Sequence, residues 1–567
     1  MKDALLKRFA PRLEFDSYED FKKNFTINVP ENFNFGFDVV DAWAELEPGK
    51  RALVWCNDAG EERIFTFDDV KAYSARICNY LISLGIRKGD RVMLIMKRRW
   101  EYWMTAVALH KLGAIMIPAS FQLTEKDLIY RINAANVRMI VIAEDENIIG
   151  HVENSAAHCP TLEYRALVTN RDGECREGWL DYRQGFMACP DRFDRPSGEY
   201  AVNSNDPMII YFTSGTTGMP KMVLHLQKYP LGHILTSRFW QQVEDNGLHL
   251  TVSDSGWAKF SWGKIYGGWL SGTAQLGYDM EKFVPEKLLR VIEKYRITTF
   301  CAPATMYRFM IKEDLTRFDL SSIHHCCMAG EPLNPAVFDQ WEQLTGHKLY
   351  EGFGQTETPV LMANFKWITP KPGSTGKPSA LYNIALVNEE GKECEIGEEG
   401  EIVIRGAKEN PPVGLTAGYL GDEEANEKLW RGGDFHTGDN AWMDEDGYIW
   451  FIGRVDDVIK CSGYRIGPFE VESALMTHPA VLECAITAAP DPVRGQVVKA
   501  TVVLVKNRGY EPTDELRKEL QNHVKKVTAP YKYPRILEFV DELPKTVSGK
   551  IRRAAIRHMD NGGGETN

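Results

Sequence analysis

The stretch VKAYSARICNYLISLGIRKGDRVMLIM (Val70–Met96) contains the local pattern from which the fold follows. Its first half repeats apolar residues at helical spacing, and Thr66 or Asp68 stands where such a helix would begin. Gly85 ends the helical pattern, and the short apolar run Arg91–Met96 follows. The stretch therefore predicts a helix that leads into a buried strand.

The same alternation continues along the chain. A second helical pattern, EYWMTAVALHKLG, ends at Gly113 and leads into the apolar run AIMIPA. A third begins at Thr124 and Asp127, which have the spacing of a capping box, and leads into RMIVIA. Further strand and helix patterns occupy Glu286–Pro303 and Ser321–Leu333. Helices that alternate with apolar strands predict parallel strands covered by helices.

The pattern changes in the last third of the chain. The Pro/Gly-rich passage TPKPGSTGKP (Thr369–Pro378) precedes shorter β-like segments, and a small α+β pattern begins after Arg454. That last unit has roughly 110 residues, an ordinary domain size. We therefore predict an α/β protein. Residues 1–454 would form a large domain of helix-covered, largely parallel sheets plus a β-rich subdomain, and residues 455–567 a small α+β domain.

Size and charge exclude several classes of protein. The chain has 567 residues, too many for one hydrophobic core, and a net charge of −12. General nucleic-acid binders and binders of anionic membranes need a basic face, so the charge argues against both. The sequence has no apolar run of about 18 residues, which predicts no membrane span, and its N-terminus resembles neither a signal nor a transit peptide.

The cysteines predict a reducing compartment. There are 11 of them without a CxxC pair, as expected for free thiols, and the cytoplasm is the default location. His324, His325, Cys326 and Cys327 are adjacent, and neighbouring residues of a strand point to opposite faces. This cluster therefore predicts a buried strand rather than a metal site.

A loop rich in glycine and hydroxyl groups follows the apolar run MIIYF. In YFTSGTTGMPKMV (Tyr211–Val223), two glycines permit turns that expose backbone amides, four hydroxyls add donors, and Lys221 adds a charge. Such a loop suits the outer phosphates of a nucleotide. A surface turn of the same composition is the alternative for this loop taken alone.

Three further motifs strengthen the interpretation of this loop as part of a nucleotide site. YEGFGQTET (Tyr350–Thr358) places an aromatic ring, an amide, a hydroxyl and a carboxylate in one turn. The segment His436–Arg465 contains Asp439 and Arg454, and LPKTVSGKIRR (Leu543–Arg553) contains a lysine in a Ser/Gly-rich loop.

With these motifs the chain resembles the adenylate-forming superfamily, which includes acyl-CoA synthetases, firefly luciferase and the adenylation domains of peptide synthetases. The resemblance covers about residues 35 to 555, in the family's order and spacing. It implies a two-step reaction: a carboxylate and ATP give acyl-AMP and pyrophosphate, and a thiol then displaces AMP. The implied ligands are ATP, Mg²⁺ and CoA, together with a small carboxylic acid.

The resemblance also implies roles at the nucleotide. The loop up to Lys221 would hold the β- and γ-phosphates, Thr356 would contact the α-phosphate, and Glu357 would help to hold Mg²⁺. Asp439 would accept from both ribose hydroxyls, and Arg454 would contact the same sugar. The implied ATP-binding residues are Thr213, Ser214, Gly215, Thr216, Thr217, Gly218, Lys221, Gly330, Glu331, Pro332, Glu351, Gly352, Phe353, Gln355, Asp439 and Arg454.

Three of these positions would recognise the base. The turn Gly330-Glu331-Pro332 would pack along the adenine, Phe353 would stack on its other face, and Glu351 would accept from the adenine amino group.

The small domain would supply the remaining chemistry. Lys550 matches the family's catalytic lysine, whose compact charge bridges the attacking carboxylate and the α-phosphate. With Thr356 and Glu357 it forms the implied catalytic set. Residues 454–457 match the hinge between the domains, with Asp456 at the pivot, so the resemblance implies that the small domain is mobile. The implied contacts with CoA are Ser462, Gly463, Arg465 and Lys525.

The residues expected to line the acyl pocket indicate which acid the enzyme would accept. Acetyl-CoA synthetases resemble this chain but have a Trp where Gly354 stands, so we expect room for a longer or branched acid, as in the medium-chain branch. Trp262 and Cys301 would line the pocket. Lys259 departs from an apolar tunnel: it would either lie at the surface or enter the pocket or thiol channel.

CoA is favoured as the acceptor because the chain ends soon after Lys550, without a carrier domain. A stand-alone enzyme that loads a separate carrier protein is one alternative, and a catalytically silent nucleotide-binding homologue is another. The sequence leaves the preferred acid and the oligomeric state open.

Overall fold

The opening stretch folds as its pattern predicts. A computed structural model describes residues 3–169, 175–213, 219–331, 333–455, 457–461, 464–491, 494–506, 509–545 and 551–560. Helix α3 (Phe67–Ser83) begins after Thr66, whose hydroxyl accepts from the Asp69 backbone N–H at 3.2 Å, while the Asp69 carboxylate accepts from the Thr66 backbone N–H at 2.8 Å. Gly85 follows with φ +82°. The predicted start and end of this helix are confirmed.

Within the described residues, the first large sheet has the strand order β19-β9-β8-β4-β3-β5-β6-β7. Its strands from β8 to β7 are parallel, whereas β8, β9 and β19 pair antiparallel at one edge. These strands are β3 (Arg91–Ile95), β4 (Ile115–Pro118), β5 (Met139–Ala143), β6 (Tyr164–Val168), β7 (Leu180–Asp181), β8 (Pro207–Thr213), β9 (Lys221–Leu226) and β19 (Gly418–Tyr419).

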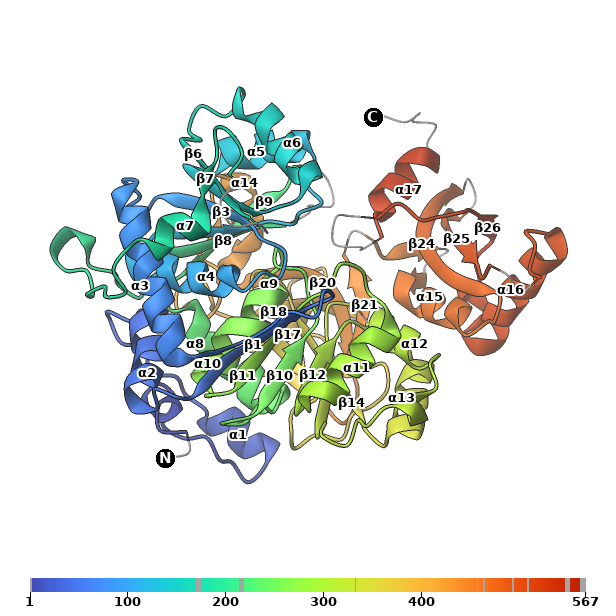
Figure 1. Cartoon of the computed structure of the whole chain (residues 1–567). Coiled ribbons are helices and arrows are strands. Elements are labelled where there is room, and N and C mark those ends of the chain that lie inside the picture. The colour runs from blue at the N-terminus through green and yellow to red at the C-terminus, as the bar shows by residue number, and fades with distance from the viewer. Residues whose placement is uncertain are drawn as a thin grey trace.

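Helices lie on the faces of this sheet, as the alternation predicted (Figure 1). They are α3, α4 (Glu101–Leu112), α5 (Glu125–Ala134), α6 (Glu146–Ala156) and α7 (Tyr182–Met187). Gly113 ends α4 with φ +73°, and Thr124 and Asp127 form the predicted capping box of α5.

The second large sheet has the strand order β16-β15-β14-β13-β12-β10-β11-β1-β2. Its central strands are parallel, and antiparallel pairs close both edges. Its strands are β1 (Arg51–Asn57), β2 (Glu62–Thr66), β10 (Leu248–Thr251), β11 (Ala274–Asp279), β12 (Thr299–Ala302), β13 (His325–Met328), β14 (Leu349–Gly354), β15 (Val360–Ala363) and β16 (Lys377–Pro378).

The helices beside the second sheet come from several parts of the chain (Figure 1). They are α8 (Tyr229–Ile234), α11 (Pro285–Tyr295), α12 (Ala304–Met310) and α13 (Pro335–Thr345), together with the N-terminal helices α1 (Tyr18–Asn24) and α2 (Ala42–Leu46). No described helix has the length and apolar character that crossing a bilayer requires.

Strand β13 confirms the prediction of a buried strand for His325, Cys326 and Cys327, whereas His324 precedes the strand and is exposed. All four of its residues are buried, and Cys326 and Cys327 belong to different hydrophobic clusters because they point to opposite faces. His325 makes a hydrogen bond of 2.7 Å with the Trp240 carbonyl oxygen.

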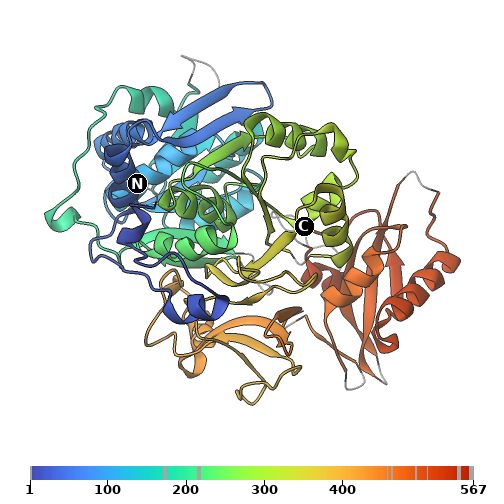
Figure 2. The same cartoon turned by 90° about the horizontal axis from the view of Figure 1, so that it is seen from below.

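A smaller antiparallel sheet follows, as the β-rich pattern predicted. Its strand order is β17-β18-β20-β21, and it forms a layer of its own below the large sheets (Figure 2). The elements are β17 (Ile384–Val387), β18 (Gly400–Ile404), β20 (Phe435–Met443), β21 (Ile449–Arg454) and helix α14 (Glu423–Leu429).

The chain after Arg454 forms an α+β lobe beside α12 and α13 (Figure 1). Its strands and helices enclose their own hydrophobic cluster. They are β22 (Ile459–Cys461), β23 (Tyr464–Ile466), β24 (Val481–Asp491), β25 (Gly495–Leu504), β26 (Ile536–Phe539), α15 (Pro468–Met476), α16 (Asp514–Val527) and α17 (Arg553–Asp560). The lobe touches the rest of the chain where the Asn334 amide donates to the Ser473 carbonyl at 3.3 Å.

Candidate active site

The predicted phosphate loop connects β8 and β9. Thr213, the last residue of β8, pairs with Lys221, the first residue of β9. Between them, Ser214, Gly215, Thr216, Thr217 and Gly218 lie outside the described residues. The Lys221 ammonium lies 4.7 Å from the centre of the Tyr419 ring. The hairpin therefore brings Thr213 and a cation to the same edge of the first sheet.

The turn after β14 lies next to this hairpin. The Gln355 backbone N–H donates to the Thr358 hydroxyl at 3.1 Å, which closes the turn. The carboxylate of Glu357 is 9% exposed, and its Oε1 accepts from the Tyr419 hydroxyl at 2.9 Å. His225 of β9 contacts the Thr356 carbonyl through Nε2 at 2.7 Å. These bonds join the second sheet to the first at the predicted metal and α-phosphate positions.

His225 is a donor in this contact. Burial lowers the pKa of His225 to about 4, so the imidazole is neutral at pH 7. A carbonyl oxygen can only accept, and the proton therefore resides on Nε2. The neutral histidine therefore holds the Thr356 turn without adding a charge at the predicted phosphate site.

Asp439 and Arg454 meet as the motif predicted. They are opposite each other in the register of β20 and β21, and Arg454 Nη1 lies 3.4 Å from Asp439 Oδ1. The side-chain amide of Gln355 donates to Asp439 Oδ2 at 2.5 Å and to the Thr437 carbonyl at 2.9 Å. A single glutamine therefore ties the proposed ribose acceptor to the turn that contains Glu357.

The predicted adenine residues lie at the ends of β13 and β14. Glu351 is buried, and its Oε2 has no hydrogen-bond partner among the described residues. Burial raises the pKa of Glu351 to about 8, against the lowering effect of the Leu333 backbone N–H. Gly352 lies against the indole of Trp240, and Phe353 lies 5.6 Å from Phe451, ring centre to ring centre. The buried Oε2 without a partner is suited to a ligand that carries a hydrogen-bond donor.

The turn at Gly330 contains a contact that the sequence did not predict. Gly330 has φ +105°, and no described atom lies within 4 Å of where a Cβ would be, so the backbone can lie flat along a ligand. Both carboxylate oxygens of Glu331, however, accept from Thr305, from its backbone N–H at 2.7 Å and its hydroxyl at 2.9 Å. Glu331 thus braces α12. Pro332 lies outside the described residues.

The acyl side begins at an interrupted helix. The helix from Ala258 changes to a π-helical turn at Trp262–Tyr266 and resumes at Gly267–Leu270. Helical irregularities of this kind are common at functional sites. The Trp262 ring stacks at 6.3 Å on His233 and lies 5.8 Å from Trp240.

Lys259 does not point into open solvent. Its side chain is half-buried, and the ammonium donates to the Ala329 carbonyl at 2.7 Å, beside the Gly330 turn. The charge of Lys259 also lowers the pKa of the buried Cys301 thiol, although the Cys327 hydrogen bond is the larger lowering contribution. The structure therefore places Lys259 near Cys301 and the predicted base site.

Gly354 is exposed and sterically restricted. A Cβ built on it would lie 2.6 Å from the Pro359 carbonyl oxygen, so any side chain there requires a shift of the backbone.

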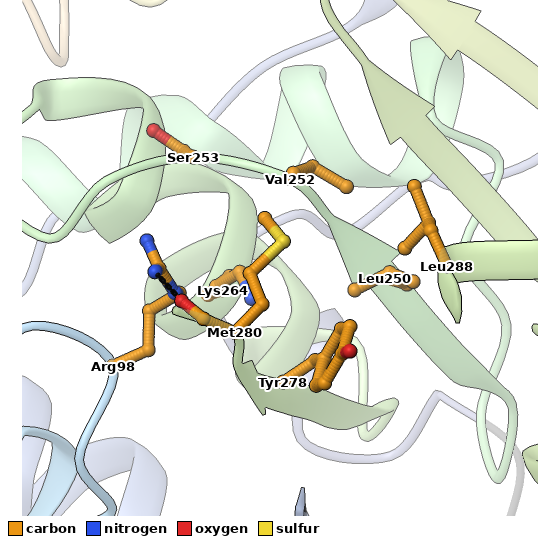
Figure 3. A pocket seen from close by; sticks show the side chains of 8 residues that line it. All are labelled: Arg98, Leu250, Val252, Ser253, Lys264, Tyr278, Met280 and Leu288. Carbon is orange, nitrogen blue, oxygen red and sulfur yellow. Dashed lines mark hydrogen bonds between the residues drawn. The ribbon is translucent and has the colours of Figure 1, made fainter. Parts of the chain in front are cut away.

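A small internal cavity of about 10 Å³ lies on the far side of the interrupted helix (Figure 3). Arg98 and Lys264 extend into it among apolar side chains. Lys264 is 1% exposed and donates to the Leu276 carbonyl at 3.2 Å. Burial lowers its pKa to about 7, helped by the Arg98 charge. The remaining lining residues are Leu250, Val252, Ser253, Tyr278, Met280 and Leu288.

Several predicted residues of the C-terminal lobe, namely Asp456, Ser462, Gly463 and Lys550, lie outside the described residues. Arg465 belongs to β23, and Lys525 of α16 places its ammonium 4.1 Å from the centre of the Tyr533 ring. Next to the predicted pivot, Asp457 accepts from Arg557 of α17 at 2.6 Å. The predicted hinge and CoA contacts remain predictions.

Sequence reasoning missed Tyr419, His225 and Thr416. The Thr416 backbone N–H donates to the Glu357 carbonyl at 2.8 Å, and its hydroxyl donates to the Leu224 carbonyl at 2.7 Å. No local motif marks these residues as part of a site. They reach it through the pairing of β9 with β19, which joins segments almost 200 residues apart.

Comparison with known proteins identifies the family of the chain. A family model described as "AMP-binding enzyme" matches residues 40–420. The chain belongs to this family. A second model, "AMP-binding enzyme C-terminal domain", matches residues 470–550, which places the C-terminal lobe in the same family.

Relatives cover nearly the whole chain. Acyl-coenzyme A synthetase ACSM3 of Rattus norvegicus, named as mitochondrial, is 40% identical over 560 residues, which are 98% of this chain and 95% of the relative. Acyl-coenzyme A synthetase ACSM4 of Homo sapiens, also named as mitochondrial, is 42% identical over 540 residues, 94% of this chain and 91% of the relative.

Solved structures of the family share the fold. The anthranilate CoA ligase AuaEII in complex with anthranoyl-AMP superposes with a TM-score of 0.84 at 28% identity, covering 94% of this chain and 98% of that chain. An acyl-CoA synthetase of Brucella canis superposes with a TM-score of 0.71 at 29% identity, covering 97% and 99%. The α/β fold class predicted from the sequence is confirmed.

Proposed function

We propose that this AMP-binding enzyme is an ATP-dependent acyl-CoA synthetase. It converts a carboxylic acid, ATP and CoA into acyl-CoA, AMP and pyrophosphate through an acyl-adenylate. The observation that carries the proposal is the Gln355 contact: its amide joins Asp439, the proposed ribose acceptor, to the turn with Thr356 and Glu357. The names of the relatives, acyl-coenzyme A synthetases at about 40% identity over nearly the full chain, support the same reaction.

In the first step, formation of acyl-AMP, each group of residues would have a separate role. A carboxylate must attack a polyanion, so cations and N–H donors have to neutralise charge around the α-phosphate. Lys221 and the loop 213–221 would hold the β- and γ-phosphates that leave as pyrophosphate. Thr356 would donate to the α-phosphate, and Lys550 would bridge the carboxylate and the phosphate. Asp439 and Arg454 would fix the ribose, and Glu351 and Phe353 the base.

The residues at the turn also fit a magnesium ion. Mg²⁺ prefers hard oxygen ligands, typically one or two carboxylates in addition to substrate phosphates. Glu357, the residue after Thr356, supplies a buried carboxylate, and its hydrogen bond with Tyr419 places it near the β8–β9 hairpin that contains Lys221. When bound, the ion would neutralise phosphate charge. Glu357 would hold it, and His225 would keep the turn in place.

The second step would use the C-terminal lobe in a different orientation. Rotation about residues 454–457, with Asp456 at the pivot, would remove Lys550 and bring Ser462, Gly463 and Arg465 to the site. Lys525 would contact the nucleotide end of CoA. The two half-reactions would then use one nucleotide site in turn.

We propose medium-chain or branched short-chain acids as substrates. Gly354 has no side chain where acetyl-CoA synthetases have a Trp, which supports room for a longer acyl chain, and the half-buried Trp262 ring would limit that length. Lys259 would restrict acyl shape near Cys301. Replacement of Lys259 by Leu should change the ranking of acids, and an unchanged ranking would argue that the lysine only braces the Ala329 carbonyl.

We propose a reducing compartment, with the cytoplasm as the first expectation. All 11 cysteines are free thiols, which suits the cytoplasm and the mitochondrial matrix equally. The mitochondrial names of the relatives make the matrix the competing location, and cell fractionation would decide between the two.

Acid-dependent exchange of pyrophosphate into ATP tests the function. Linear acids from two to ten carbons, branched short-chain acids and aromatic acids are compared, and the active ones are repeated with CoA while thioester and AMP are followed. We expect the highest exchange with four to eight carbons or branched acids, and CoA-dependent release of AMP. Exchange without CoA turnover would indicate a carrier-protein loader, acetate as the best acid would overturn the pocket argument, and no exchange with any acid would indicate a silent homologue.

A further inference from the structure

Tyr419 contacts both charged groups at the pyrophosphate end of the site. Its hydroxyl donates to Glu357 Oε1 at 2.9 Å, and its ring centre lies 4.7 Å from the Lys221 ammonium. Glu357 lies on the turn between β14 and β15 of the second sheet, and Lys221 begins β9 of the first sheet. One side chain thus connects an anion and a cation that come from different sheets.

The backbone of Tyr419 is itself held tightly. It pairs with Val223 in the register of β9 and β19. The side-chain amide of Asn426 accepts from its N–H at 2.7 Å and donates to its carbonyl at 2.7 Å. Gly418, with φ +116°, permits this because a Cβ there would lie 2.6 Å from the Asn426 amide oxygen. The ring is therefore presented from a fixed backbone.

The chemistry of the two contacts is suited to positioning. The Tyr419 hydroxyl is the donor in its contact with Glu357, because the carboxylate oxygen accepts. Its bond to Oε1 fixes the direction of the Glu357 carboxylate. The ring face attracts the Lys221 ammonium and limits its movement. Outer partners of this kind orient the groups that bind a metal or phosphate.

We propose that Tyr419 is a positioning residue that holds Glu357 and Lys221 in one arrangement for the magnesium-bound pyrophosphate end of ATP. The proposal rests on the function proposed above, because the ligand of Glu357 and Lys221 is assigned there. Tyr419 takes no part in bond formation. Its removal should weaken the response to Mg²⁺ while leaving the second half-reaction intact.

The substitution Tyr419→Phe separates the two contacts, because it keeps the ring under Lys221 and removes only the hydroxyl. We expect the Mg²⁺ concentration for half-maximal acyl-AMP formation to rise about tenfold. Thioester formation from supplied acyl-AMP should stay within about twofold of the parent, since pyrophosphate has then left. Tyr419→Leu should in addition weaken inhibition by pyrophosphate, because the ring under Lys221 is lost.

A matched control is Tyr382→Phe. Tyr382 is 2% exposed, and its hydroxyl donates to the Val413 carbonyl at 3.1 Å rather than to Glu357. The same loss of a buried hydroxyl should leave the Mg²⁺ response unchanged. A readout independent of turnover is calorimetric binding of an ATP analogue with a methylene β–γ bridge. Added Mg²⁺ should strengthen binding less in Tyr419→Phe than in Tyr382→Phe.

A double-mutant cycle with Glu357→Gln completes the test. If Tyr419 acts through Glu357, the double variant responds to Mg²⁺ as Glu357→Gln alone does. Additive effects, or a Tyr419→Phe response equal to that of Tyr382→Phe, would overturn the proposal while leaving the synthetase function in place. If Glu357→Gln itself keeps the parental Mg²⁺ response, the metal role of Glu357 and the role of Tyr419 fail together. Acid-dependent exchange by the parent still tests the function separately.

Discussion

The proposed nucleotide side and the proposed acyl side of the site are built from different interactions. On the nucleotide side, Asp439, Gln355 and Glu357 are fixed by hydrogen bonds with named partners on other sheets. On the acyl side, Trp262 packs among aromatic rings. Lys264, two residues later on the same helical segment, is buried. Polar contacts demand particular residue types at particular places, whereas packing demands mainly volume and shape. Substitutions on the nucleotide side should therefore affect all acids equally, and those on the acyl side should change their ranking.

The largest effect should come from Lys550→Ala, which breaks only the first half-reaction. Removal of a cation at the reacting phosphate should lower acyl-AMP formation about 100- to 1000-fold for every acid. Thioester formation from supplied acyl-AMP should remain within about twofold. Lys545→Ala is the control, because Lys545 pairs with Glu483 at 2.8 Å and is assigned no role at the nucleotide. Equal loss in both half-reactions, measured by rapid quench, would refute the role of Lys550.

Trp262→Ala should change the ranking of acids and leave the KM for ATP unchanged. Removing the indole provides room for further methylenes, each worth about 0.8 kcal/mol when buried, or about fourfold in kcat/KM. Steady-state kinetics on linear acids from four to ten carbons would measure the shift. Trp442→Ala truncates a half-buried indole that stacks on Trp450 outside the pocket and should alter no ranking. A uniform loss for all acids in Trp262→Ala would remove this residue from the pocket.

Glu351→Gln should remove a pH dependence from nucleotide binding. With the Glu351 pKa raised to about 8, the carboxyl of the free protein is mostly protonated at pH 7, while an adenine amino group donates best to the ionised form. Binding would then release a proton, so affinity should rise with pH up to about 8 and level off above it, by about three- to tenfold in all. Calorimetric titration of ATP from pH 6.5 to 9 would show this rise in the parent and a smaller one in Glu351→Gln. Identical profiles would argue that Glu351 does not contact the base.

Lys264→Met should have the smallest effect on activity and a measurable effect on stability. The folded pKa of Lys264 is about 7, against an ordinary value of 10.5. Between pH 7 and pH 10.5 the unfolded chain therefore binds more protons than the folded chain, so the free energy of unfolding rises with pH across this range. Below pH 7 the folded state bears the full cost of the buried charge. The variant should gain about 1 to 3 kcal/mol in free energy of unfolding at pH 7 and lose that pH dependence.

Denaturant unfolding at pH 7 and 9 would measure this gain. Lys111→Met is the matched control, because Lys111 is equally buried but pairs with Asp41 at 2.7 Å. That variant leaves an unpaired buried carboxylate and should lose stability. If Lys264→Met also loses stability, the hydrogen bond of the Lys264 amine to the Leu276 carbonyl outweighs the cost of its burial.

Local features of the sequence predicted much of the fold. Thr66, Gly113 and Thr124 bound their helices as expected, because capping depends on neighbouring backbone groups. The partner of β1 was not predictable in this way. Its Leu53 pairs with Gln275 of β11, and nothing near Leu53 specifies that register. The π-helical turn at Trp262 was also missed, since it depends on how the segment packs rather than on its own periodicity.

The sequence by itself determined the alternation of helices and strands and the residues that carry the chemistry, because both depend on residue type at short spacing. Only the tertiary structure decided which of these residues meet. It placed Tyr419 between Glu357 and Lys221, directed Glu331 to Thr305, and turned Lys259 toward Ala329. Such contacts depend on strand pairing and helix packing between distant segments, and those are selected by burial of the whole chain rather than by local preference.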